Sequence, residues 1–153
     1  MKRLTDLALG LLMAVTLSGC VAWGHGLDPV DPVGRKIFPS PTIESLQPTL
    51  TWEAADPEEK PGARYQLIVY RLEGFPAHEV IVYSRRDLTT TSHRLDEPLL
   101  PNTRYHWRVG VTYSRGTETR TEWNGYRGFH FIPLPFIWFI GFTSGTYSFD
   151  TPA

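Results

Sequence analysis

The chain has very little cysteine, since Cys20 is the only one among 153 residues. A single cysteine excludes an intramolecular disulfide, so a folded domain here must be held together by its packed core. Charge of one sign is not in excess either, with 15 Lys and Arg against 16 Asp and Glu. The arginines are scattered rather than clustered, so nucleic-acid binding is not expected.

Signatures of catalysis and of metal binding are also missing. No serine sits in a nucleophile elbow, and no glycine-rich phosphate loop is present. The acidic residues Asp56, Glu58 and Glu59 do not follow the ligand order of a calcium loop. The five histidines have no spacing that forms a metal pair within one helix or strand; they stand at positions 25, 78, 93, 106 and 130. We therefore expect a protein that is not an enzyme and that has no cofactor or metal.

The N-terminus has no apolar run long enough to span a membrane, and its apolar segment is short. Lys2 and Arg3 precede an uncharged apolar segment at residues 7–17. That segment has 11 residues, whereas a membrane-spanning helix needs ~20. A charged start followed by a short apolar segment is typical of an export signal with a helical apolar region.

The residues that follow, LSGC at 17–20, resemble the lipobox of bacterial lipoproteins at all four positions. The resemblance implies that the Cys20 sulfur receives a diacylglyceryl group, that residues 1–19 are removed as a signal peptide, and that the new amino terminus is acylated. Val21 is not the aspartate that the family associates with inner-membrane retention. The resemblance therefore implies an outer-membrane lipid anchor with the domain facing the periplasm.

Residues 20–44 are rich in glycine and proline and show no regular hydrophobic period. This composition predicts a flexible tether between the lipidated cysteine and the folded domain. A flexible stretch of ~20 residues would hold a domain ~25 Å from the membrane surface.

Apolar and polar residues alternate in several runs after residue 45, which predicts an all-β fold. Leu50 and Trp52 share one side of their run, and a run at residues 79–84 is rich in β-branched residues. The expected core positions of the other two runs are Tyr65, Leu67 and Val69, then Tyr105, Trp107, Val109, Val111 and Tyr113. Turn signals between these runs predict an antiparallel sandwich of the immunoglobulin-like kind over residues 45–152.

The segment LLPNTRYHWRV, residues 99–109, resembles the corner between strands E and F of fibronectin type III domains. The matching positions are Leu99, Pro101, Thr103, Tyr105 and Val109. The resemblance implies that Tyr105 is a tyrosine corner, with its ring in the core and its hydroxyl bonded to upstream backbone. It also implies that Trp52 is a core residue and that residues 145–152 contain the final strand.

A long insertion, residues 114–146, departs from that family pattern. Asn124 and Gly125 predict a tight hairpin turn within it. Residues 129–142 contain no charged side chain, yet they are too short and too rich in proline to span a bilayer. Three interpretations stay open: this segment packs over the sandwich, docks a protein partner, or dips into the leaflet that holds the lipid. The candidate partner or membrane contacts are Phe136, Ile137, Trp138 and Phe139.

Together these patterns predict a lipid-anchored periplasmic protein that binds or assembles rather than catalyses, docking a protein partner through the aromatic insertion. No small-molecule ligand is assigned. One alternative is an accessory protein that binds or processes envelope carbohydrate with sheet-face aromatics and His106. The other is a purely structural spacer.

Overall fold

A computed structural model describes residues 19–33, 40–133 and 138–153, with side chains described for 23–33, 40–127 and 145–153. The regular structure in these ranges is all β, as expected from the alternation. The described part holds no helix with the length and hydrophobicity that a membrane span requires. The expected signal peptide, apart from Gly19, lies outside the described residues.

The chain divides into two compact units. The larger unit, residues 24–126 and 145–153, is called the sandwich below. The smaller unit comprises residues 1–23 and 127–144. Its strands belong to a three-stranded sheet formed by β1 (Gly19–His25), β9 (Gly125–Pro133) and β10 (Trp138–Gly145), called the insert sheet below.

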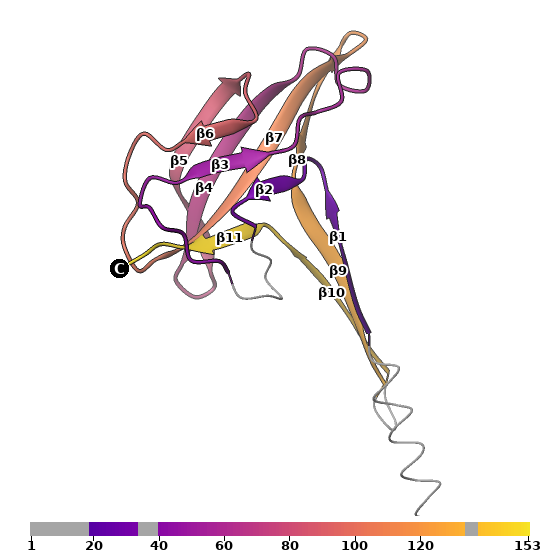
Figure 1. The fold of residues 1–153 in the computed structure, drawn as a ribbon. Helices are drawn as coiled ribbons and strands as arrows, with labels where there is room; N and C mark the ends of the chain where they lie inside the picture. Colours follow the sequence, from indigo (N-terminus) through magenta and orange to yellow (C-terminus); the bar gives the residue numbers. More distant parts are fainter. Residues whose placement is uncertain (1–18, 34–39, 134–137) are drawn as a thin grey trace, which may run out of the picture. The chain divides into compact units, whose positions relative to one another are not determined.

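The sandwich contains two antiparallel sheets (Figure 1). The first has the order β2 (Pro29–Asp31), β3 (Thr49–Trp52), β6 (Ser92–Arg94). The second has the order β11 (Tyr147–Asp150), β7 (Arg104–Arg115), β4 (Arg64–Glu73), β5 (His78–Leu88), and β8 (Glu118–Trp123) also pairs with β7. Since a strand has two edges and β4 occupies one edge of β7, strands β8 and β11 share the other edge.

The core between the two sheets follows the alternation in the sequence. Every second residue of β7 from Tyr105 to Tyr113 is at most 4% exposed, and Trp107 is fully buried. Leu50 and Trp52 supply the facing positions of β3. The expected core positions in both sheets are therefore confirmed. Ile68 and Tyr70, which lie on the opposite phase of β4, are buried as well.

Tyr105 makes the contacts expected of a corner residue. Its hydroxyl accepts a hydrogen bond of 3.0 Å from the backbone N–H of Leu100, and its ring lies 6.0 Å from that of Phe149. The bond satisfies a backbone donor just before β7 begins. It therefore joins the chain that enters β7 to the core.

The prediction of a flexible tether is wrong for residues 24–33. Leu27 is 5% exposed and belongs to the core, and Pro29–Asp31 pairs with β3. The backbone carbonyl of Asp28 accepts the backbone N–H of Glu53 at 2.9 Å. The backbone carbonyl of Pro32 accepts the indole N–H of Trp107 at 3.1 Å. These long-range bonds order a segment that has no hydrophobic period of its own. The sandwich accordingly begins before residue 45.

The prediction of a tight turn at Asn124 and Gly125 is also wrong. The hairpin turn lies between β7 and β8, where Arg115 pairs with Glu118. Gly116 occupies this turn with φ of 65°, a conformation that glycine adopts without steric cost. Asn124 is instead 3% exposed, and β9 starts directly after it. The insertion thus adds β8, β9 and β10 between β7 and β11.

Candidate functional site

Some of the predicted site residues have a described backbone, and all of these lie in the insert sheet. Cys20 lies in β1, and Trp138 and Phe139 begin β10. Their side chains lie outside the described ones, and Phe136 and Ile137 lie wholly outside the described residues. β9 is the central strand of this sheet, so the predicted lipidation site, in β1, and the aromatic insertion, in β9 and β10, belong to one sheet.

Contacts at one end of the insert sheet fix the direction of its strands. A Cβ added to Gly125, at the start of β9, would lie 2.9 Å from Cε1 of His25, at the end of β1. A Cβ added to Gly145, at the end of β10, would lie 2.7 Å from the hydroxyl oxygen of Tyr126. Because these strands are neighbours in the sheet, β9 runs antiparallel to both β1 and β10. Cys20 therefore lies toward the end of the sheet at which β9 finishes and β10 begins.

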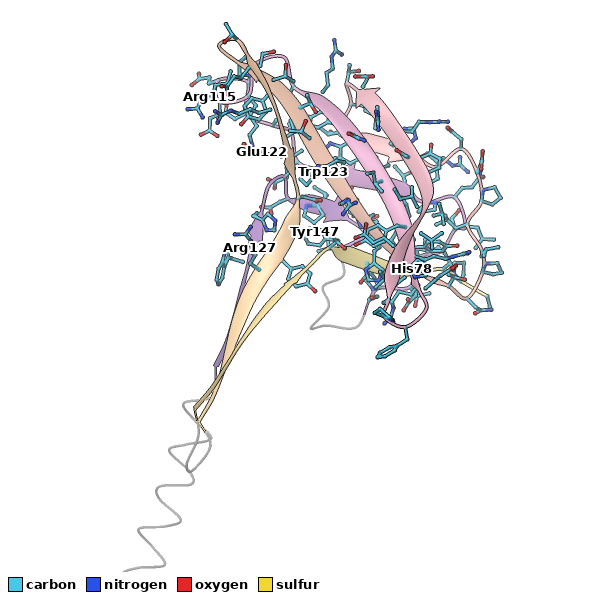
Figure 2. The ribbon with its side chains drawn as sticks, turned by 180° about the vertical axis from the view of Figure 1, so that it is seen from behind. His78, Arg115, Glu122, Trp123, Arg127 and Tyr147 are labelled. Carbon is cyan, nitrogen blue, oxygen red and sulfur yellow. The ribbon has the colours of Figure 1, made fainter. Side chains whose placement is uncertain are left out.

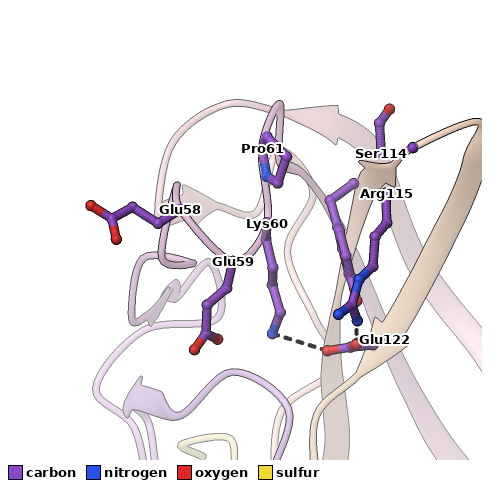
Figure 3. Close-up of a pocket in the computed structure, with 9 residues that line it drawn as sticks. Glu58, Glu59, Lys60, Pro61, Ser114, Arg115 and Glu122 are labelled. Carbon is purple, nitrogen blue, oxygen red and sulfur yellow. Dashed lines mark hydrogen bonds and ion pairs between the residues drawn. The ribbon is translucent and has the colours of Figure 1, made fainter.

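The sandwich carries a polar pocket of about 570 Å³ between the β3–β4 loop and the β7–β8 hairpin (Figure 3). Glu58, Glu59 and Lys60 line it from the loop, and Arg115 and Glu122 line it from the hairpin. The lining carries both signs of charge. Among its described residues, no group of three or more potential metal ligands is present.

The centre of this pocket is an ion pair whose partners satisfy one another. Lys60 Nζ lies 2.9 Å from Glu122, and the Tyr113 hydroxyl donates to the same carboxylate at 2.5 Å. The bond from Tyr113, followed by the contact with Lys60, lowers the pKa of Glu122. Lys60 also lies over the Tyr113 ring, 5.8 Å from its centroid. These contacts join the β3–β4 loop to β7 and β8, which gives the cluster a structural role.

Aromatic and cationic side chains stack on the outer face of the second sheet, where Figure 2 labels Trp123. The rings of Tyr70 and His106 stack with centroids 5.4 Å apart. The guanidinium of Arg108 lies 5.4 Å from the ring centroids of both Tyr70 and Trp123, and it bonds to Glu79 at 3.1 Å. Burial is the main reason why the pKa of Tyr70 is raised. The ring faces are therefore occupied by neighbouring protein groups.

A third polar cluster joins the edge strands of the two sheets. The hydroxyl of Tyr83, in β5, lies 2.7 Å from His93 Nε2, in β6, and donates to Asp96 at 3.0 Å. Arg85 pairs with the same carboxylate. Arg85 first and Tyr83 second lower the pKa of Asp96. A tyrosine, a histidine and an aspartate thus come together, and their contacts link one sheet to the other.

The β4–β5 hairpin exposes apolar side chains that sequence reasoning did not single out. Phe75, at its tip, is fully exposed, and Leu72 and Ile81 are about half exposed. Leu72 pairs with Glu79 and Tyr70 pairs with Ile81, so Leu72 and Ile81 are diagonal neighbours on the sheet. These three residues are called the hairpin patch below. Gly74, Phe75 and Pro76 between two strand patterns signal the hairpin in the sequence, but not the exposure of its apolar residues.

Comparisons of this chain with protein-family models, with curated proteins and with solved structures found no match.

Proposed function

We propose that this chain is a lipoprotein of the bacterial outer membrane whose fibronectin type III-like domain binds or assembles with a protein partner in the periplasm, without catalysis. The anchor is the lipid on Cys20. The observation that carries the proposal is the lipobox LSGC after a short apolar segment, with the acylated residue in a unit separate from the sandwich. Such an arrangement leaves the sandwich available for binding.

The family assignment is supported by the corner and by the strand order. The Tyr105 hydroxyl meets the backbone of Leu100, as a tyrosine corner requires. In chain order, β2, β3 and β6 occupy the positions of strands A, B and E, while β4, β7 and β11 occupy those of C, F and G. β5 then corresponds to the additional strand beside C.

The hairpin patch is the surface we assign to the protein partner. Phe75 is a fully exposed aromatic side chain at a hairpin tip, and aromatic residues are enriched at protein interfaces. Leu72 and Ile81, on the two strands that this tip connects, add half-exposed apolar surface. A charged pair lies on the same face of the sheet, because Glu79 pairs with Leu72 in the strand register and bonds to Arg108. An apolar centre with a polar rim is the usual anatomy of a protein interface.

The alternative of a carbohydrate-binding face receives less support. Sugar platforms need open aromatic faces, whereas Tyr70 is 4% exposed and is covered by His106 and Arg108. Trp123 lies against Gly110, where an added Cβ would meet its ring at 3.0 Å. We therefore interpret this cluster as a ladder that stabilises the outer face of the sheet.

Replacement of the lipidated cysteine tests the anchor. In a diderm host fed a clickable palmitate analogue, the unaltered chain should incorporate the label and fractionate with outer membranes. Cys20→Ser should lose the label and retain residues 1–19, because no thiol remains to receive the diacylglyceryl group. Ser18→Ala, which preserves the thiol and the small residue before it, is the matched control. Labelled and correctly shortened Cys20→Ser protein would refute the anchor.

A photo-crosslinking amino acid at position 75 tests the partner surface in living cells. We expect a discrete crosslinked species from position 75 and none from position 117, an exposed site at the β7–β8 turn. Leu72→Ser with Ile81→Ser should remove the species from position 75 without loss of the folded domain. Equal crosslinking from both positions would contradict the assignment.

A further inference from the structure

We infer that the apolar end of the insert sheet enters the membrane leaflet that holds the lipid of Cys20. This inference rests on the proposed acylation of Cys20, and it names a lipid surface, rather than a protein, as what the aromatic insertion contacts.

The first step is the charge pattern of the three strands. β1, β9 and β10 contain no Asp, Glu or Lys, and their one arginine is Arg127, at the third position of β9. Beyond Arg127, toward the apolar end, the only basic residue of these strands is His130. The sheet therefore becomes almost wholly uncharged as it extends away from Gly125.

The second step is the distribution of apolar residues over both faces. Successive residues of a strand lie on opposite faces. Phe129 and Phe131 occupy one face of β9 and Ile132 the other, while Trp138 and Phe139 begin β10 on opposite faces. The residues of β1 from Cys20 to Trp23 are likewise apolar at every position. A sheet with this pattern needs an apolar cover on both faces.

The third step is the identity of that cover. The unit that contains the insert sheet consists of residues 1–23 and 127–144. Once residues 1–19 have been removed, the described residues of that unit, 20–23, 127–133 and 138–144, all belong to the three strands, so none of them is left to cover a face of the sheet. The acyl chains on Cys20, in contrast, start at the end of the sheet where β9 finishes and β10 begins. The lipid that holds the protein is thus already next to the apolar residues.

The depth of insertion is limited by the edges of the sheet. β1 and β10 are edge strands, and hydrocarbon offers no partner for unpaired backbone N–H and C=O groups. We therefore expect a shallow position, ~5–10 Å into the boundary between headgroups and acyl chains. Trp138 suits this interfacial zone, where indole rings are enriched.

A depth measurement with a fluorescent probe tests the inference on the full acylated protein. Because the diacylglyceryl group blocks the Cys20 sulfur, Phe139→Cys provides the only free thiol for an environment-sensitive NBD label. The protein is placed in vesicles of phosphatidylethanolamine and phosphatidylglycerol. We expect blue-shifted emission, loss of fluorescence with doxyl-labelled lipid, and protection from aqueous iodide. Phe75→Cys, labelled in the same way, should give the opposite pattern because Phe75 is fully exposed on the sandwich.

Two outcomes overturn the inference. Quenching of the position-139 probe by iodide but not by doxyl lipid would put this strand in water. Protection from both quenchers would mean that protein covers it. Phe129→Cys in β9 repeats the measurement if Phe139→Cys does not fold. A purified protein whose mass shows no acyl chain would refute the anchor alone, and Cys20→Ser carrying the same probes would then test vesicle contact independently.

Discussion

The sandwich and the insert sheet are built from strands with opposite hydrophobic patterns. In β7 the buried residues alternate with residues that are partly or fully exposed over most of the strand, since Tyr105 and Trp107 face the core while Arg104 and His106 do not. In β9 the apolar residues from Phe129 to Ile132 occupy both faces. Alternation means that one face is covered from within the chain and the other meets water. Its absence means that something outside those strands must cover them.

Because of this difference, we expect the sandwich to determine the stability of the domain and the insert sheet to determine its contact with the membrane. The sandwich places its large aromatic side chains in a shared core, so their loss should unfold the domain. The insert sheet places its aromatic residues beside the proposed lipid anchor, so their loss should weaken membrane contact and leave the domain folded. Tryptophan substitutions in the two regions test this contrast directly.

Trp107→Ala should have the largest effect. The ring is fully buried, its N–H bonds to Pro32, and it lies 6.3 Å from the ring of Tyr147. Truncation leaves a cavity and an unpaired carbonyl, so we expect a loss of about 3–5 kcal/mol in the free energy of unfolding. Urea denaturation of the mature chain carrying Cys20→Ser, followed by circular dichroism, measures it.

Trp138→Ala is the matched variant in the insert sheet. It should change the free energy of unfolding of the sandwich by less than about 0.5 kcal/mol, the usual range for positions away from a core. It should also reduce flotation of the protein with vesicles. If Trp138→Ala destabilised the sandwich as much as Trp107→Ala, the insertion would be part of the core and the contrast would fail.

Asn124→Ala tests where the sandwich ends, with an intermediate effect. The Asn124 side-chain oxygen accepts the backbone N–H of Val109 at 2.8 Å, and the Asn124 backbone N–H donates to the Val109 carbonyl at 2.9 Å. Without the side chain, the buried N–H of Val109 has no acceptor. We expect a loss of about 1–3 kcal/mol in the same denaturation assay. Thr117→Ala, at an exposed turn, should change little; equal losses would mean that the bond is not needed.

The sequence predicted well the features that are encoded within single strands. The alternation in β7 identified Tyr105, Trp107 and Val109 as core residues, because one strand specifies both of its faces. The tether was predicted wrongly at residues 24–33 because Leu27 and Asp28 are ordered by contacts with distant parts of the chain, while residues 34–39 of the predicted tether lie outside the described residues. The hydrophobic pattern within a short segment does not show which distant strand the segment pairs with.

The same distinction holds for the candidate sites. Cys20 could be predicted as a lipidation site from the sequence because the lipobox is four adjacent residues, and this stays a prediction. The hairpin patch could not, since Leu72 and Ile81 meet only through the register of β4 with β5. Asn124 was misread for a related reason: its amide oxygen accepts from Val109, 15 residues away, and this bond rather than a turn sets its conformation. Pairing across strands is the information that the sequence does not display.

Lowering the pH should reduce the stability of the sandwich but not that of the insert sheet, and this effect is the smallest of those predicted. Arg104 donates two hydrogen bonds of 2.8 Å to Asp150 and joins β7 to β11. This pairing lowers the pKa of Asp150 below its ordinary 3.8. A lowered folded-state pKa contributes stability that is present above pH 3.8 and is lost as the pH falls through the folded value. The insert sheet contains no carboxylate side chain and lacks this dependence.

Asp150→Asn should therefore cost the sandwich about 0.5–1 kcal/mol at pH 7, the range for a partly exposed ion pair. The difference from the unaltered protein should shrink as the pH is lowered below 3.8, because the unaltered Asp150 then becomes protonated too. Urea denaturation at a series of pH values gives both quantities, with Glu97→Gln as a control that removes one exposed carboxylate outside this pair. Vesicle contact of the Asp150→Asn protein should match that of the unaltered protein at each pH. A parallel loss of vesicle contact would mean that the insert sheet depends on the sandwich for its attachment to lipid.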